Sequence, residues 1–311
     1  MSAAVADAID RLDALAVERG VELRADVPLA PLTTLRVGGR ADRLAAAGTV
    51  EELVGLIRLA REAGVPAFLL GKGSDVVVAD AGIRGLVVRV RADTATIDGT
   101  TLIAEAGASM TALAKRCAEA GLAGFDWAIS IPGSVGGAVW ANAGAHGGEM
   151  AQVVGEVEAL GADGTRERLA QSECAFAYRE SRFKHGDEII LGARIELERG
   201  EPAAIRALVD GHQALRRATQ PLADQNAGSV FRNPPDDYAG RLIEAAGLKG
   251  HRLGSARVSE LHANFIVTDR GGHAADVRAL GDHVRATVAD RFGVDLRYEI
   301  EFVGDWPEQL A

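Results

Sequence analysis

The amino-acid sequence predicts an α+β protein with two domains. The chain has 311 residues, of which 48% are hydrophobic, and this is enough to bury two cores. Apolar residues recur at helical spacing in several segments, and short β-branched runs bounded by glycine and aspartate lie between them. The pattern of predicted elements changes near Gly200, where a helix leads into a segment with its own turns. We therefore expect a domain boundary near Gly200.

The first domain alternates predicted helices and strands. Residues 1–19 form an amphipathic helix, because Val5, Ile9, Leu12 and Leu15 recur at helical spacing. The elements predicted after it are helices at 49–63, ended by Gly64, and at 109–120, with Ser109 as N-cap, and strands at 67–70, 76–78, 86–90, 153–160 and 189–197.

The second domain is expected to have its own turns, helices and strands. Its predicted elements are helices at 201–217, 238–246 and 274–292, turns at 226–235, and strands at 264–267 and 296–303. Side chains alternate along the last strand, so Leu296, Tyr298 and Ile300 share one face while Glu299 and Glu301 share the other.

Composition and charge narrow the class of protein. The formal net charge is −10 and no Lys/Arg-rich run appears, so nucleic acid is not an expected partner. Cys117 and Cys174 form no CxxC motif and no spacing typical of zinc, so no metal is expected. Residues 1–19 lack the features of a signal peptide, and no run of 18 apolar residues could span a membrane. We expect a cytoplasmic protein without membrane insertion, and a monomer, although the sequence does not fix the oligomeric state.

Two glycine-rich segments suggest a site for phosphate groups. Gly71 and Gly73 match neither a GxGxxG motif nor a Walker A loop, which disfavours a Rossmann domain and a P-loop ATPase. Placed after a strand, they would let successive backbone N–H groups converge on an anion. The segment 131–137 offers a second run of N–H groups that enters a short helix. Two such nests would hold a diphosphate without any arginine; the alternative is that the glycines only make tight turns.

Five ordered segments resemble the UDP-N-acetylenolpyruvoylglucosamine reductase (MurB) family. They are TLRVGG at 34–39, LLGKGSD at 69–75, IPGSVGGA at 131–138 running on to NAGA at 142–145, YRESRF at 178–183 and AGSVFRNP at 227–234. Weaker matches are LIEAAGLKG at 242–250, HANF at 262–265 and YEI at 298–300. The short spacing between the fourth and fifth segments is similar to the family type that lacks a tyrosine-loop insertion over the substrate, so another segment must supply any lid.

The resemblance implies a fold and a cofactor. It implies a vanillyl-alcohol-oxidase-like (PCMH-type) FAD-binding domain at 30–200, followed by a smaller α+β substrate-binding domain at 201–311, with 1–29 as an N-terminal helical segment. The last strand is a candidate to pack back on the FAD-binding domain. FAD would be bound noncovalently between the two glycine segments. The residues implied to contact it are Gly71, Lys72, Gly73, Ser74, Asp75, Ile131, Pro132, Gly133, Ser134, Gly136, Gly137, Asn142 and Gly144.

The resemblance also implies a reaction, the NADPH-dependent reduction of UDP-N-acetylglucosamine enolpyruvate to UDP-N-acetylmuramate through FAD, in peptidoglycan precursor synthesis. A hydride reaches C3 and a proton reaches C2, so the protein must neutralise an enolate-like dianion and deliver one proton. Ser229 beside Gly228 fits the proton donor. Arg179 fits the electrophile, because a guanidinium keeps its proton and can hold a carboxylate in a bidentate fork. The family match favours Glu299 over Glu301, in the role of orienting the arginine or the enolate.

Other residues are candidates for substrate contacts. Those implied by the resemblance are Tyr178, Asn233, Lys249 and Asn264, with Arg217 or Gln220 more loosely placed at the diphosphate. His262 either lines the site or only packs.

Two other functions compete with the reductase. One is an oxidase of the same fold with covalently bound flavin, for which His146 could serve as the attachment point. The other is a non-catalytic protein that binds a nucleotide sugar. Flavin released by acid would favour the reductase over the oxidase, and a yellow purified protein would exclude the binding protein.

Overall fold

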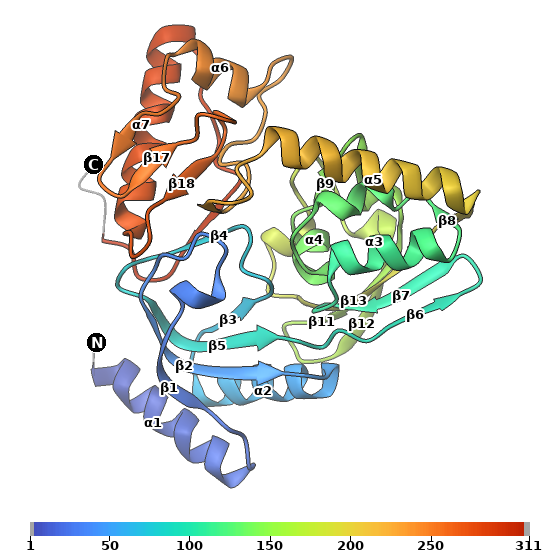
Figure 1. The fold of residues 1–311 in the computed structure, drawn as a ribbon. Coiled ribbons are helices and arrows are strands. Elements are labelled where there is room, and N and C mark those ends of the chain that lie inside the picture. Colours follow the sequence, from blue (N-terminus) through green and yellow to red (C-terminus); the bar gives the residue numbers. More distant parts are fainter. Residues whose placement is uncertain (1–2, 308–311) are drawn as a thin grey trace. The chain divides into compact units, whose positions relative to one another are not determined.

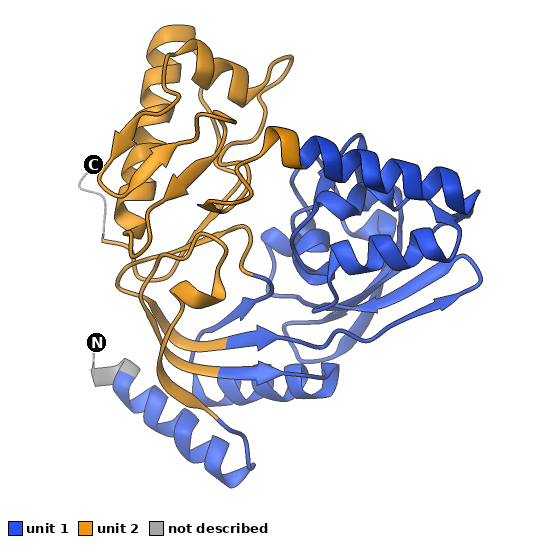
Figure 2. Cartoon of the chain, in the orientation of Figure 1, with its two compact units in different colours: residues 1–22, 45–72, 88–216 blue, residues 23–44, 73–87, 217–311 orange. Residues whose placement is uncertain are grey.

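A computed structural model describes residues 3–307 of the protein. The chain divides into two compact units (Figure 2). Unit 1 comprises residues 1–22, 45–72 and 88–216, and unit 2 comprises residues 23–44, 73–87 and 217–311. This division differs from the single boundary expected near Gly200. Helix α5 (Pro202–Thr219) continues unit 1 to Arg216, because it contributes buried Ile205 and Val209 to the core of that unit.

The helices and strands follow one another in the order drawn in Figure 1. The remaining helices are α1 (Ala3–Glu18), α2 (Val50–Ala63), α3 (Met110–Glu119), α4 (Val135–Trp140), α6 (Ala239–Ala245) and α7 (Ala274–Phe292). The strands are β1 (Arg24–Pro28), β2 (Arg40–Ala47), β3 (Ala67–Leu70), β4 (Val76–Val78), β5 (Ile83–Val90), β6 (Ala95–Asp98), β7 (Thr101–Glu105), β8 (Leu122–Ala123), β9 (Gly144–Ala145), β10 (Gly148–Glu149), β11 (Val154–Leu160), β12 (Arg166–Ala170), β13 (Ile189–Glu196), β14 (Glu198–Arg199), β15 (Gln225–Asn226), β16 (Arg252–Leu253), β17 (Ala256–Val258), β18 (Ile266–Thr268) and β19 (Glu301–Val303). Short 3-10 helices are η1 (Ala30–Leu32), η2 (Asp126–Ser130), η3 (Met150–Gln152), η4 (Gln171–Glu173) and η5 (Arg182–Lys184).

Unit 1 is built on an antiparallel sheet of order β12-β11-β13-β7-β6. Helix α4 packs on β13 and β7, and α3 packs on η2 (Figure 1). The core of the unit includes Phe125, Met110 and Leu102, which are almost fully buried. The sheet therefore supports the segment 131–137, which enters α4.

Unit 2 contains a second antiparallel sheet, of order β15-β18-β17-β16, covered by α7. Strand β19 pairs in parallel with β4, so the end of the chain returns to the stretch expected to bind FAD. Buried Leu35 and Val77 join the C-terminal residues in one core. A further sheet has the order β1-β2-β5-β3.

Local sequence signals account for several helix ends. Thr49 accepts a hydrogen bond from the Glu52 amide at 3.1 Å, which caps the start of α2, and Gly64 ends that helix with a φ of 70°. Gly293 ends α7 in the same way with a φ of 69°. Ser109 occupies the N-cap position of α3, but its hydroxyl contacts the Thr111 hydroxyl at 3.1 Å instead of capping the helix.

The expected last strand is shorter than its sequence pattern. Only Glu301–Val303 form a ladder, and the preceding residues make one isolated bridge, between Tyr298 and Phe231. The partner changes along the segment, because Tyr298 bridges to Phe231 whereas Glu301–Val303 pair with β4. The predicted alternation of burial holds only in part, since Leu296 and Ile300 are buried but Tyr298 and Glu299 are both half-buried.

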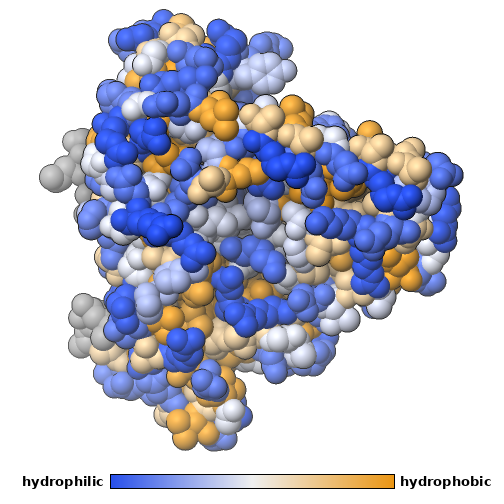
Figure 3. Space-filling model, in the orientation of Figure 1, coloured by the Kyte–Doolittle hydropathy of each residue, from blue (hydrophilic) through white to orange (hydrophobic). Residues whose placement is uncertain are grey.

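The surface carries scattered hydrophobic residues. On the face drawn in Figure 3, hydrophobic and hydrophilic residues are intermixed. The exposed large hydrophobic residues of the described chain include Val17, Leu208, Leu215 and Leu261. Across residues 3–307, no helix has both the length and the apolar character needed to cross a bilayer.

Candidate active site

The two glycine segments meet in unit 1. Gly71 follows β3, and a Cβ atom placed on it would lie 2.5 Å from the Ser134 hydroxyl, in the segment that enters α4. Part of the second segment is already used inside the protein, because the amides of Val135 and Gly136 donate to backbone carbonyls at 2.9 Å and 2.8 Å. The run of exposed N–H groups expected at 131–137 is therefore interrupted at Val135 and Gly136, and any anion must be bound by other amides. The close approach at Gly71, which a side chain would fill, fits a group held by backbone donors.

Gly73 has a different structural requirement, within unit 2. Its φ is 67°, and an added Cβ atom would lie 2.4 Å from the Leu32 carbonyl oxygen and 2.9 Å from the Thr33 Cα atom. The Gly73 carbonyl also accepts a hydrogen bond from the Thr34 amide at 2.8 Å. A larger residue at this position would disturb the packing of the chain on itself, so its effect on flavin would not report on binding alone.

The other candidates near Gly73 are partly accessible. Lys72 is exposed, Ser74 and Asp75 are half-buried, and the Asp75 carbonyl accepts from the Glu301 amide at 2.9 Å, next to the β4–β19 pair.

We expect Gly71→Ala to remove most of the bound flavin from purified protein, as measured by flavin absorbance relative to protein. The added methyl group would meet Ser134 Oγ at 2.5 Å, which is closer than real Cβ contacts allow, but would lie at an ordinary 3.6 Å from Ser134 Cβ. The double variant with Ser134→Ala should therefore recover the unfolding midpoint and remain poor in flavin.

The matched controls for this prediction are Ser134→Ala alone, which reports the contribution of the hydroxyl, and Gly211→Ala on α5. No atom lies within 4 Å of the Gly211 Cβ position, so that change should leave both flavin and packing intact. A double variant with full flavin content would mean that the space at Gly71 is not used for the cofactor.

Asn142, a candidate cofactor contact, has a structural role in unit 1. It is fully buried with a φ of 42°; its amide nitrogen donates to the Ala177 carbonyl at 2.8 Å, and its side-chain oxygen accepts from the Ala151 amide at 2.9 Å. Asn142 therefore joins the strand-turn segment at Gly144 to the loop that carries Arg179.

Asn142→Ala is expected to lower the free energy of unfolding by about 1–3 kcal/mol, because the Ala151 amide loses its acceptor and the Ala177 carbonyl loses one of its two donors. The measurement is urea-induced unfolding. Gln152→Ala is the control, since Gln152 is exposed and its hydrogen bonds are long, at 3.3 Å and 3.4 Å. Equal unfolding midpoints for the two variants would show that the Asn142 bonds contribute little.

Arg179 lies in unit 1 and is held in a defined orientation. Its φ is 56°, its guanidinium donates from Nη2 to the Gly144 carbonyl at 2.9 Å, and it lies over the Tyr178 ring at 5.0 Å from the ring centre. The structure thus brings three of the predicted residues together, Arg179, Tyr178 and Gly144. Tyr178 itself is about half exposed.

His146, the possible covalent attachment point of the competing oxidase, makes contacts within the protein. Its Nε2 lies 2.8 Å from the Ser130 hydroxyl, and its ring stacks on that of His212 at 3.9 Å. His212 in turn lies 3.0 Å from a carboxylate oxygen of Asp126. Burial, followed by the neighbouring His212, lowers the pKa of His146, which favours its neutral form.

Ser229 and Glu299 lie on neighbouring backbone segments of unit 2. The Glu299 amide donates to the Val230 carbonyl at 2.9 Å, so Glu299 stands opposite the residue that follows Ser229. Asn264 fixes the same segment, because it bonds both backbone groups of Phe231, at 3.0 Å and 2.8 Å, and its carbonyl accepts from the Val230 amide at 2.8 Å. Asn264, a predicted substrate contact, is 4% exposed, and its side-chain amide is hydrogen-bonded within the protein, where it holds the Ser229 segment.

Gly228 and Asn226 set the conformation before Ser229. Gly228 has a φ of 79°, and its amide donates to the Asn226 side chain at 3.0 Å, two residues earlier. This is an Asx turn, and Asn226 also donates to Asp224 and Pro221 carbonyls. Asn226 is absent from the sequence-based candidates, although the Asn-x-Gly spacing was a signal for it.

The remaining substrate candidates are nearer the surface. Asn233 is exposed and accepts a hydrogen bond from the Ala239 amide at 3.1 Å, which caps the region where α6 begins. Lys249 pairs with Glu244 at 2.8 Å. Arg217 is exposed and Gln220 is half-buried.

His262 packs in unit 2 and supports Asn264. Its Nδ1 accepts from the Asn264 amide at 3.2 Å, and its ring lies edge-on to Phe265 at 4.8 Å. Burial, followed by the charge of Lys249, lowers the pKa of His262. A neutral ring is what this acceptor role requires, because protonation would place an N–H where the bond is accepted.

The stability of the protein should therefore depend on pH through His262. The unfolded pKa is about 6.5 and the folded pKa is lower, so the unfolded chain binds a proton first as the pH falls. The contribution is complete above the unfolded pKa and is lost as the pH falls through the folded pKa, by at most about 1.4 kcal/mol per pH unit for a fully shielded group and by less for this partly exposed ring. The measurement compares unfolding midpoints of the wild type and His262→Asn, which keeps an acceptor, between pH 8 and pH 5. Identical slopes for the two proteins would contradict this role.

Comparison with known proteins shows which family the chain belongs to. A family model described as the FAD binding domain matches residues 41–170, and one described as the UDP-N-acetylenolpyruvoylglucosamine reductase C-terminal domain matches residues 220–303. UDP-N-acetylenolpyruvoylglucosamine reductase 2 of Symbiobacterium thermophilum is 47% identical over 300 residues, which cover 96% of this chain and 97% of that one. The chain belongs to the UDP-N-acetylenolpyruvoylglucosamine reductase family. It is therefore an FAD-dependent oxidoreductase, as the sequence resemblance implied.

Other members of the reductase family agree along the length of the chain. The protein of that name from Moorella thermoacetica is 44% identical over 299 residues, covering 94% of this chain and 99% of that one. The crystal structure of the reductase (MurB) from Thermus caldophilus superposes with a TM-score of 0.77 at 34% identity, covering 92% of this chain and 99% of that one. These likenesses confirm the predicted α+β fold, in which an FAD-binding domain precedes the family's C-terminal domain.

Proposed function

We propose that this reductase-family chain converts UDP-N-acetylglucosamine enolpyruvate into UDP-N-acetylmuramate, with NADPH as reductant. When bound, FAD supplies the hydride that NADPH provides and that reaches C3 of the enolpyruvyl group. The backbone around Gly71 and the start of α4 would hold it noncovalently, and the close approach of Gly71 to Ser134 supports this assignment.

Ser229 is proposed to deliver the proton to C2. A serine hydroxyl is a weak acid, so it acts only when its position is fixed at the carbon that carries the charge. The Asx turn at Asn226, the positive φ of Gly228 and the bonds from Asn264 together fix the backbone on both sides of Ser229. This preorganisation of the Ser229 segment beside Glu299 is the observation that carries the proposal.

Arg179 and Glu299 are proposed to manage the charge that develops on the substrate. The Arg179 guanidinium keeps its positive charge and would bind the substrate carboxylate, while its bond to Gly144 limits the orientations it can adopt. Glu299 would orient the cation or the enolate. Tyr178, Asn233, Lys249 and Asn264 remain proposed substrate contacts, and Asn264 would act mainly by holding the Ser229 segment.

Two measurements distinguish the reductase from its alternatives. Acid treatment should release FAD into the supernatant, whereas retention on the polypeptide would favour an oxidase attached through His146. The contacts of His146 with Ser130 and His212 favour release, because they give this exposed ring partners within the protein. Mass spectrometry of the product should show two added hydrogen atoms; an unchanged UDP-sugar would contradict the proposal. The chain is further proposed to be a cytoplasmic monomer. Sedimentation analysis tests the monomeric state.

A further inference from the structure

The segment that leads to Glu299 is tied to α7 by the side chain of Tyr298. The Tyr298 hydroxyl donates to Asp282 Oδ1 on α7 at 2.8 Å. Burial, then the bond to Asp282, raises the pKa of this phenol, so it remains a donor throughout the physiological range. The ring of Tyr298 stacks on that of Phe231 at 5.0 Å, and its edge contact with Phe302 is at 4.9 Å.

Helix α7 has a gap that accepts this hydroxyl. Gly281 is buried in the interior of α7, and a Cβ atom placed on it would lie 2.5 Å from Tyr298 Oη and 2.9 Å from Cε1. A glycine inside a helix is less stable than alanine by about 1 kcal/mol. The docked tyrosine gives a reason for glycine at this position.

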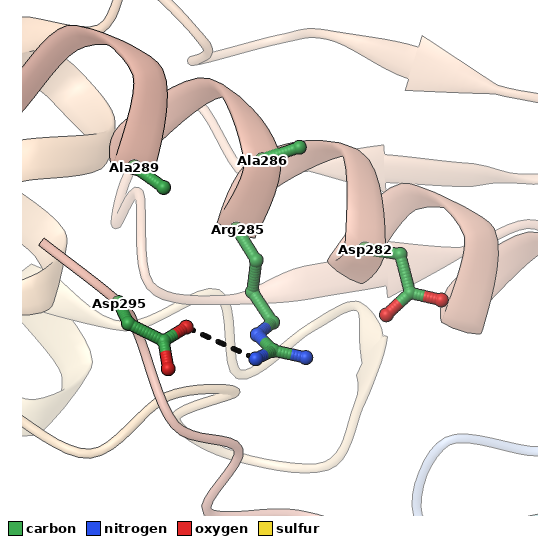
Figure 4. Close-up of a pocket in the computed structure, with 5 residues that line it drawn as sticks. All are labelled: Asp282, Arg285, Ala286, Ala289 and Asp295. Atoms are coloured by element: carbon green, nitrogen blue, oxygen red, sulfur yellow. Dashed lines mark hydrogen bonds and ion pairs between the residues drawn. The ribbon is translucent and has the colours of Figure 1, made fainter. Parts of the chain in front are cut away.

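A second contact between α7 and the segment before Glu299 involves Arg285. Figure 4 shows Asp282 and Arg285 projecting from α7 at a shallow depression of about 260 Å³, with Arg285 pointing to Asp295. Arg285 bonds Asp295 Oδ1 at 3.0 Å and the Leu296 carbonyl at 2.8 Å, and it lies over the Tyr298 ring at 5.3 Å. The cation at this depression is thus used to hold the chain just before Glu299.

The backbone pairing alone defines the position of Glu299 weakly. Tyr298 and Phe231 form an isolated bridge, flanked by two backbone bonds, from Arg232 to Arg297 at 2.9 Å and from Glu299 to Val230 at 2.9 Å. A slip of one residue would turn the carboxylate to the opposite face. Anchors outside the pair specify one register: the β4–β19 ladder begins two residues after Glu299, and the Tyr298 side chain acts at the bridge itself, immediately before Glu299.

We propose that Tyr298, through its hydroxyl bond to Asp282 and its stacking on Phe231, is a positioning residue that sets the register of Glu299 against the segment of Ser229. The inference rests on the proposed catalytic function of Glu299. The proposed role depends on one hydrogen bond and one ring contact. The hydrogen bond can therefore be removed while the ring is kept.

Tyr298→Phe keeps the ring and removes the hydroxyl. We expect kcat to fall roughly 10-fold, with KM for UDP-N-acetylglucosamine enolpyruvate, flavin content and the reduction of the flavin by NADPH all within about 2-fold of wild type. Asp282→Asn, which keeps an oxygen acceptor, should retain most of the activity, whereas Asp282→Ala should resemble Tyr298→Phe. Tyr238→Phe is the matched control, because Tyr238 is 68% exposed and lies outside this contact.

The decisive comparison is made in the Glu299→Gln background. If Tyr298 acts through Glu299, adding Tyr298→Phe should cause little further loss of kcat, whereas independent effects on the fold would multiply. Full multiplication, or a wild-type kcat for Tyr298→Phe alone, would overturn the positioning role. A wild-type kcat for Glu299→Gln would instead contradict the proposed function of Glu299, so the two failures are distinct.

Discussion

Replacing Ser229 with alanine is expected to leave FAD content and NADPH-driven reduction of the flavin near normal, while slowing reoxidation by the enolpyruvyl substrate. Proton delivery is needed only after the hydride has reached C3, so only this second half-reaction should depend on the hydroxyl. The expected loss is roughly 10²–10⁴-fold, the usual contribution of a positioned general acid. Ser229→Cys should recover part of the rate, because a thiol can also donate a proton.

The measurement is stopped-flow absorbance of the two half-reactions, recorded separately. Ser172→Ala provides a matched control, since Ser172 is exposed on η4, away from the Ser229 segment in sequence and outside unit 2. Reoxidation of the Ser229→Ala enzyme at the wild-type rate would mean that the proton comes from elsewhere, and Tyr178 or a water held by Glu299 would be the next candidates.

Arg179→Ala and Glu299→Ala are each expected to cost about 2–4 kcal/mol in kcat/KM, or roughly 30- to 1000-fold, the range for losing one preorganised charge-stabilising group. Arg179→Lys should recover little, because an ammonium cannot reproduce the bidentate fork, and its shorter reach would weaken the bond now made to Gly144. Reduction of the flavin by NADPH should survive in all three variants.

The controls for the charged residues separate their roles from general surface effects. Glu301→Ala tests the choice between the two glutamates and should have a much smaller effect than Glu299→Ala. Arg168→Ala removes an exposed cation whose ion pair with Glu156 is long, at 3.8 Å, and should be close to neutral. Loss of the first half-reaction in Arg179→Ala or Glu299→Ala would place these residues at the nicotinamide or the flavin and contradict their proposed role.

The sequence predicts the regular elements well where periodicity and end signals agree. Helix α7 covers the expected residues 274–292, and α2 begins after Thr49 and ends at Gly64, as its capping residues indicate. The last strand is predicted to be longer than it is, because its alternating pattern reflects the burial of Leu296 and Ile300 and carries no information about the partner strand. Tyr298 bridges to Phe231 and Glu301–Val303 pair with β4, and only the folded chain reveals that these segments meet.

The candidate residues could be selected from ordered motifs, but their contacts could not. Motifs identify Asn142 and Asn264, but they do not show that both side-chain amides form hydrogen bonds with backbone groups of other segments. The same limit applies to Tyr298, since its contact with Gly281 depends on how α7 packs on the last segment. Such long-range contacts depend on packing, to which no local periodicity corresponds.

The most direct test of the proposed function is NADPH oxidation by the purified flavoprotein with and without UDP-N-acetylglucosamine enolpyruvate, followed by the absorbance of NADPH. The proposal predicts steady multiple turnover only when the enolpyruvyl sugar is present, with one NADPH consumed for each UDP-N-acetylmuramate formed. Sustained oxidation without that substrate, or none with it in a protein that retains its FAD, would contradict the proposal.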